Sequence, residues 1–148
     1  MFDYILRLIV VLLLSSLVGL ERERQDKPAG LRDVMLVGLG TTAFVIVSLQ
    51  LAEVASQYAS TVKYDIGRIS AYVIASIGFL GSGAIIQHKG NTEGITTAAV
   101  LWTIVGVGLL CGLGDFILAT VLAGMIYGIL KLKYLTTRGI DDEVKQTN

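Results

Sequence analysis

The chain has 148 residues, of which 53% are apolar and 16% are charged, and its mean hydropathy is +0.70. A soluble helical domain needs polar faces on its helices, whereas these polar residues gather in short islands between long apolar runs. That pattern excludes an ordinary soluble domain and predicts a polytopic membrane protein. The formal net charge of zero gives no basic surface for nucleic acid, and the single cysteine, Cys111, excludes an internal disulfide.

Five apolar runs are each near the ~20 residues that a helix needs to cross ~30 Å of hydrocarbon. They predict an all-α fold, a bundle of about five transmembrane helices, because a helix satisfies its own backbone hydrogen bonds in lipid. The predicted spans cover residues 2–20, 34–52, 66–86, 95–113 and 116–135. Residues 1–135 therefore form one transmembrane domain. The polar segment 87–94 is predicted to be a loop, and 136–148 a short cytoplasmic tail.

The basic residues predict the orientation, because cytoplasmic loops carry an excess of lysine and arginine. With the N-terminus outside and the C-terminus cytoplasmic, only Arg7, Lys63 and Arg68 lie toward the outer side. The other nine of the 12 are cytoplasmic: Arg22, Arg24, Lys27, Arg32, Lys89, Lys131, Lys133, Arg138 and Lys145. This bias argues against a dual-topology exporter.

Glycines recur at helical spacing in the last three predicted spans. Small residues at such spacing let helices approach closely in a membrane, where lipid provides no hydrophobic drive between them. We expect them to pack helices within one bundle; the alternatives are a homodimer seam, or a helix break at Gly78–Gly83 that lines a cavity. The glycines concerned are Gly78, Gly81, Gly83, Gly108, Gly112, Gly124 and Gly128.

The charged island after the first run, Glu21-Arg22-Glu23-Arg24, is the first candidate functional site. Charges near a membrane core are costly and are functional candidates by default. If the first helix continues past Leu20, Glu21 and Arg24 share a face. The simpler interpretation is a solvated helix end. The functional one is a cytoplasmic contact or ion site, held by the Pro28-Ala29-Gly30 turn and by Arg32.

Asp65 and Arg68, at the start of the third run, are the second candidate. Asp65 suits a helix N-cap with Arg68 one turn later; the alternative is a partly buried ion pair or a cation ligand. Carboxylates suit Mg²⁺, so Asp65 is a candidate metal ligand and Mg²⁺ the candidate ion, with no other cofactor expected. Asp3, Glu53 and Asp115 fall on the same predicted side and would contribute if all four converge.

The sequence argues against an enzyme. His88 is the only histidine and has no plausible partners, so no Ser/His/Asp or Cys/His set exists for nucleophilic catalysis.

Three segments together resemble the membrane domain of the MgtC/SapB family of bacterial inner-membrane proteins. They are VGLERERQDKPAGLRDVMLVGLG from Val18, DIGRISAYVIASIGFLGSGAII from Asp65 and EGITTAAVLWTIVGVGLLCGLG from Glu93. They cover nearly half of the chain, and the ERER cluster followed by PAGLR is the most specific. The family's recurrent polar positions match Glu21, Arg22, Glu23, Arg24, Arg32, Asp65 and Arg68.

The resemblance implies a multi-pass protein of the bacterial plasma membrane, linked to adaptation to low magnesium and, in pathogens, to virulence. It favours a non-enzymatic regulator that contacts other membrane proteins, including the ATP synthase, or a second copy of itself within the lipid bilayer. The alternative is a small transporter or channel for Mg²⁺ or H⁺. Longer members carry a soluble C-terminal domain, whereas about a dozen polar residues follow Leu135 here.

Overall fold

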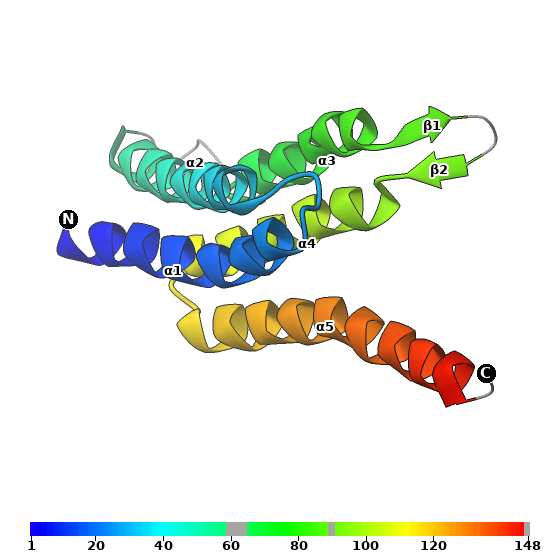
Figure 1. Ribbon diagram of the computed structural model, residues 1–148. Helices are drawn as coiled ribbons and strands as arrows, with labels where there is room; N and C mark the ends of the chain where they lie inside the picture. The colour runs from blue at the N-terminus through cyan, green and yellow to red at the C-terminus, as the bar shows by residue number, and fades with distance from the viewer. Residues whose placement is uncertain (59–64, 89–90, 147–148) are drawn as a thin grey trace.

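The computed structural model describes residues 1–58, 65–88 and 91–146, and these form a helical bundle (Figure 1). The five helices are α1 (Phe2–Arg24), α2 (Leu31–Tyr58), α3 (Gly67–Ala84), α4 (Ile95–Leu113) and α5 (Phe116–Gln146). Each lies on one of the five apolar runs, so the predicted helical fold is confirmed.

Several boundaries differ from the prediction. α2 is longer at both ends than the predicted span 34–52, and α3 is slightly shorter than the predicted span 66–86. α1 continues through the charged island to Arg24, because helical backbone suits the straight side chains of Glu and Arg. The predicted loop at 87–94 is instead an antiparallel hairpin of β1 (Ile86–His88) and β2 (Asn91–Glu93), with Ile86 opposite Glu93. α5 runs to Gln146, so the predicted tail is helical there; residues 147–148, like Lys63 and Lys89 of the orientation argument, lie outside the described residues.

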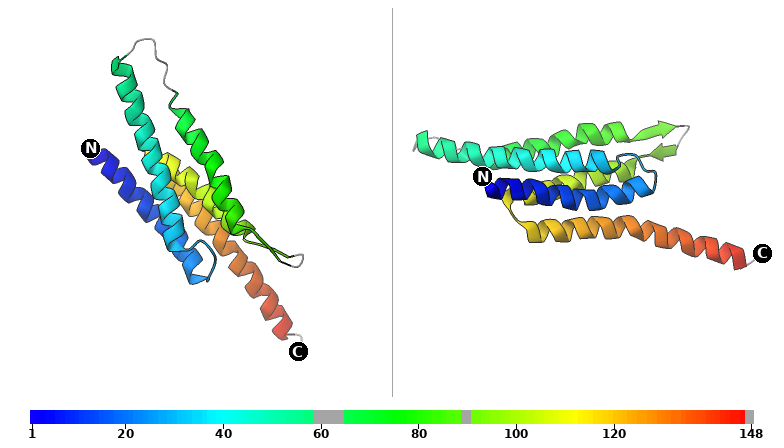
Figure 2. Two further views of the ribbon diagram at one scale, coloured as in Figure 1. Left: turned by 90° about the horizontal axis from the view of Figure 1, so that it is seen from above. Right: turned by 60° about the vertical axis from the view of Figure 1, so that its left-hand side comes forward.

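α4 is the central helix of the bundle and contacts the other four helices. α1 and α2 pack side by side against it, whereas α3 and α5 lie on opposite sides of this core (Figures 1 and 2). The core is built from small and branched side chains, among them Val11, Val18, Val34, Ile104 and Val107, all fully buried. The positions of the other four helices therefore all depend on their packing against α4.

Close approach of α2 and α4 depends on two of the predicted packing glycines. A methyl group on Gly108 would lie 2.7 Å from Cβ of Thr41, and one on Gly112 would lie 2.5 Å from Cβ of Val45. Thr42 adds a buried hydrogen bond from its Oγ1 to the carbonyl of Gly108, 2.9 Å long. Gly38, which the spacing argument missed, packs less tightly against α1, where an added methyl group would lie 3.2 Å from Cβ of Ser15. The signal for it is a small residue in α1 facing a glycine in α2.

The remaining predicted packing glycines behave differently. Gly81 lies 3.6 Å from Ala98 of α4, an ordinary contact. A methyl group on Gly78, Gly83, Gly124 or Gly128 would meet no atom within 4 Å. These four point away from the bundle, so packing within one chain does not account for them. Spacing along a helix gives a shared face, but it does not give the direction of that face.

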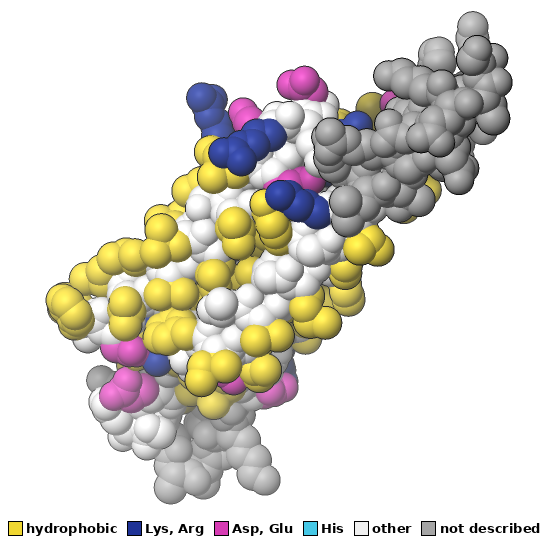
Figure 3. Space-filling model, turned by 60° about the horizontal axis from the view of Figure 1, so that its bottom comes forward, with side chains coloured by type: hydrophobic (Ala, Val, Ile, Leu, Met, Phe, Trp, Pro, Cys, Tyr) yellow, Lys and Arg dark blue, Asp and Glu magenta, His cyan; other side chains and the backbone are white. Residues whose placement is uncertain are grey.

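By length and composition, α1, α2 and α4 can each cross a membrane. α3 is not among these helices, and the apolar part of α5, Phe116–Leu132, is shorter. On the face shown in Figure 3, apolar side chains cover the middle and charged side chains lie at the two ends. This distribution of side chains is typical of a protein that lies in a bilayer. That all five helices span the bilayer, and in which orientation, stays a prediction.

We predict that Gly112→Ala destabilises the bundle by about 1–3 kcal/mol, the usual cost of overpacking, because its methyl group overlaps Val45. The matched control, Gly124→Ala, adds a methyl group in open space and should be neutral or slightly stabilising. Unfolding of the purified protein in detergent measures both. Equal loss in the two variants would contradict the assigned helix contact.

Candidate functional site

The four charged residues at the end of α1 point in different directions. Successive side chains on an α-helix are about 100° apart, so Glu21, Arg22, Glu23 and Arg24 cannot share one face. Glu21 and Arg22 are buried, whereas Glu23 and Arg24 are exposed. These four residues are consecutive in the sequence, but they contact different parts of the structure.

Arg22 joins α1 to the following turn and to α4. Its side chain is 4% exposed, and its Nη2 donates to the carbonyl of Pro28 at 3.0 Å and to Oγ1 of Thr97 at 2.5 Å. Thr97, in the first turn of α4, is itself 2% exposed. A buried charge must be hydrogen-bonded to be tolerated, and these oxygens serve that purpose. We call Arg22, Pro28 and Thr97 the arginine clamp.

Glu23 caps the next helix from eight residues upstream. Its Oε2 accepts a hydrogen bond of 2.8 Å from the backbone N–H of Leu31, the first residue of α2. A carboxylate at a helix N-terminus satisfies a free donor and interacts favourably with the helix dipole. Gly30 is needed for this arrangement, since any Cβ there would overlap the Glu23 carboxylate. The PAG turn therefore needs glycine at position 30 for a steric reason.

Between α1 and α5 lies a cavity of about 410 Å³ that we call the α1–α5 groove. Its polar lining consists of Glu21, Arg24, Gln25, Tyr127 and Lys131. Glu21 is 7% exposed, and its Oε1 accepts a hydrogen bond from Nε2 of Gln25. Arg32, the last candidate of this segment, is exposed outside the groove. Glu21 and Arg24 therefore share a surface, as their i, i+3 spacing predicts.

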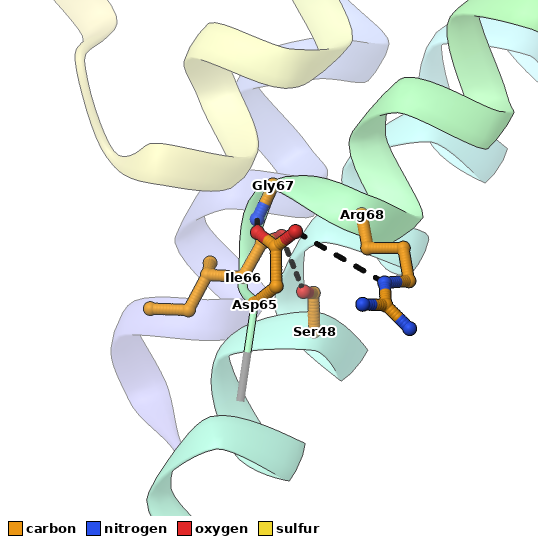
Figure 4. A network of polar contacts seen from close by, with 5 residues as sticks. All are labelled: Ser48, Asp65, Ile66, Gly67 and Arg68. Carbon is orange, nitrogen blue, oxygen red and sulfur yellow. Dashed lines mark hydrogen bonds and ion pairs between the residues drawn. The ribbon is translucent and has the colours of Figure 1, made fainter. Parts of the chain in front are cut away.

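Asp65 and Arg68 lie where α3 begins (Figure 4), at the end of the bundle opposite to the α1–α2 turn (Figure 2). Oδ1 of Asp65 accepts a hydrogen bond of 3.0 Å from the N–H of Gly67, and its Oδ2 is 4.0 Å from Nε of Arg68. Their side chains are 62% and 71% exposed. Ser48 of α2 donates to the carbonyl of Ile66 at 2.9 Å, which fastens this start of α3. The N-cap position of α3 is Ile66 and not Asp65 as predicted, but Asp65 still bonds the backbone of the first helical residue, and its exposed pair with Arg68 is not a buried ion pair.

The four carboxylates expected at this end do not converge. Within the described part of the chain, no three His, Cys, Asp or Glu side chains are grouped as a metal site. Asp115 accepts a hydrogen bond of 3.1 Å from the N–H of Leu118 in the first turn of α5, and Asp3 pairs with Arg7 at 2.6 Å. Both act in local structure, so within the part of the chain that the structure describes these four carboxylates do not form a magnesium site.

Arg7 is a structural residue that the sequence argument treated only as a charge for orientation. Its side chain is 15% exposed and donates from Nη1 to the carbonyl of Gly112, at the C-terminal end of α4. A cation there satisfies a free carbonyl and suits the negative end of the helix dipole. The ion pair could have been predicted from the sequence, because Asp3 and Arg7 have i, i+4 spacing on one helix.

Comparison with known proteins gives a match to the MgtC family model over residues 8–138. The chain belongs to the MgtC family. The resemblance inferred from the ERER and PAGLR segments is thereby confirmed, and with its apolar helices the family member is a helical membrane protein. No solved structure matches the chain.

Among its relatives, this MgtC-family chain is 41% identical over 116 residues to "Protein MgtC" of Salmonella typhimurium strain LT2, which covers 78% of the chain and 46% of the relative. It is 36% identical over 138 residues to a protein of Haemophilus influenzae, and the match covers 90% of this chain and 57% of that protein. "Putative magnesium transporter YhiD" of Escherichia coli K12 is 37% identical over 115 residues, covering 77% and 53%. The chain thus spans about half the length of these relatives.

We predict that Arg22→Met lowers the unfolding free energy by about 1–3 kcal/mol, because the carbonyl of Pro28 and the hydroxyl of Thr97 lose a buried donor. Arg32→Met, an exposed arginine of the same segment, should change it by less than about 0.5 kcal/mol. Unfolding in mixed detergent measures both variants. A loss at Arg32 as large as that at Arg22 would contradict the clamp.

Proposed function

We propose that this MgtC-family protein is a non-enzymatic regulator in the bacterial plasma membrane, linked to magnesium limitation, that acts through helix–helix contacts with other membrane proteins. The observation that carries this proposal is a pair of outward helix faces, one on α3 and one on α5, on opposite sides of the core. Gly78, Gly83, Gly124 and Gly128 all point away from the bundle. Outward glycines permit close approach of a helix that does not belong to this chain.

Large apolar side chains accompany these glycines. Phe79 of α3 is 83% exposed, and Ile117 and Ile129 of α5 are 79% and 70% exposed. A ridge of large side chains beside small ones is the surface that a packing helix needs. The partners that we propose are a second copy of the chain or another membrane protein, such as the ATP synthase implied by the family resemblance.

The polar candidates support regulation indirectly. Arg22 and Glu23 bind backbone groups that set the α1–α2 turn, and Asp65 binds the start of α3. The α1–α5 groove lies at the end opposite to Asp65 and Arg68, so these residues do not line it. Arg22, Glu23 and Asp65 are thus engaged in holding backbone segments in place.

Transport of a small cation, Mg²⁺ or H⁺, is the second candidate. The printed name of the Escherichia coli relative refers to magnesium transport. In this chain, the carboxylate of Glu21 is nearly buried in a groove between two helices, and charged groups at such positions in membrane proteins are functional candidates. Asp65 remains the candidate at the other end.

Flux in liposomes separates the two functions. With purified, folded protein and a Mg²⁺ dye or a pH dye inside the vesicles, we expect no flux above that of empty vesicles. The comparison includes Glu21→Gln and Asp65→Asn. Flux in the wild type that either substitution abolishes would reject the regulator and support transport through the corresponding end.

Photocrosslinking in growing bacteria tests the contact surface. A photoreactive side chain at Phe79 or Ile129 should give a discrete adduct with another membrane protein, or with a second copy, when magnesium is limiting. The same group at Ile104, which is fully buried, is the matched control and should give no such adduct. Adducts with lipid alone at the outward positions would count against the proposal.

A further inference from the structure

The α1–α5 groove combines an apolar part with a basic part. Leu17 and Leu20 of α1 line it nearer the middle of the bundle, and Arg24 and Lys131 line it nearer the basic end. Its volume of about 410 Å³ falls within the range of small-molecule sites. An occupant that satisfies both parts must be amphipathic, with an apolar portion and a negatively charged head.

Two positively charged side chains of the groove, Arg24 and Lys131, can bind a negatively charged group. Among the described residues, neither Arg24 nor Lys131 has a carboxylate within 4 Å. The negative charge of Glu21 is hydrogen-bonded by Gln25, and the buried guanidinium of Arg22, the next residue, offsets it electrostatically. The groove therefore carries a net positive charge, despite its one carboxylate.

Tyr127 gives the basic end a defined geometry. Nζ of Lys131 lies 5.1 Å from the centre of the Tyr127 ring, so the ammonium group is held over an aromatic face. Tyrosine is enriched where the apolar core of a bilayer meets the headgroups, and lysine reaches outward from that level. Figure 3 shows basic and acidic side chains together at this end of the face, beyond the apolar middle.

We propose that the α1–α5 groove binds the phosphate headgroup of an anionic phospholipid. Arg24 and Lys131 contact the phosphate, and an acyl chain lies along Leu17 and Leu20. Basic pockets between transmembrane helices on the cytoplasmic side are suited to such headgroups. A free phosphate would use the same two cations, but it would leave the apolar half of the groove unfilled. An anionic phospholipid is therefore the occupant that fits both the basic and the apolar part of the groove.

The test is native mass spectrometry of the full chain, released from nanodiscs that contain equal amounts of phosphatidylglycerol and phosphatidylcholine. The wild type should retain phosphatidylglycerol preferentially. The double variant Arg24→Gln/Lys131→Gln should lose that preference by about 10-fold or more, because it removes both cations that contact the phosphate, and one hydrogen bond to a charged group alone contributes about 10-fold. The control Lys27→Gln/Arg32→Gln removes two exposed basic residues of the same end and should retain the preference.

Three outcomes would overturn the proposal. One is no preference for phosphatidylglycerol in the wild type. Another is an equal loss in the two double variants, which would indicate general attraction to the basic end. The third is release of the lipid by millimolar inorganic phosphate, which would indicate a site for a soluble anion. Circular dichroism shows whether each variant is folded, and the single variants Arg24→Gln and Lys131→Gln replace the pair if it is not.

Discussion

A buried arginine without a carboxylate partner is the constraint on which the basic end of this bundle depends. The guanidinium of Arg22 is 4% exposed, and its Nη2 bonds Pro28 and Thr97, whereas its Nε has no partner among the described residues. A charge in such surroundings is tolerated only while its hydrogen-bond acceptors stay in place. Arg22 therefore determines where the α1–α2 turn lies relative to α4.

The other contacts of the bundle follow from that position. With the turn fixed, Glu23 reaches the start of α2, and α2 can approach α4 at Gly108 and Gly112. The same segment of α1 directs Glu21 and Arg24 toward α5, which forms the groove. One short motif thus supplies a structural face, through Arg22 and Glu23, and a surface available to a ligand, through Glu21 and Arg24. The outward glycines of α3 form a separate surface on the opposite side of the core, whereas Gly124 and Gly128 of α5 lie on the same helix face as Tyr127 and Lys131 of the groove.

The sequence predicted the helices well, because apolar runs of membrane length have few alternatives in lipid. The fourth span, 95–113, has the bounds of α4 itself. The sequence also identified Glu21 and Arg24 as one face. It could not assign Arg22, whose acceptor Thr97 lies 75 residues away, nor distinguish the buried Gly112 from the outward Gly124. Those differences depend on which helix lies opposite, and spacing along one helix does not contain that information.

The central claim is that Arg22 and Thr97 act together as a clamp, and a double-mutant cycle tests it most directly. Unfolding free energies of Arg22→Met, Thr97→Val and the double variant, measured in mixed detergent, give the interaction energy of the pair. We predict a coupling of about 1–2 kcal/mol, as expected for a buried hydrogen bond to a charged group. Additivity within about 0.3 kcal/mol would show two independent residues and would contradict the clamp.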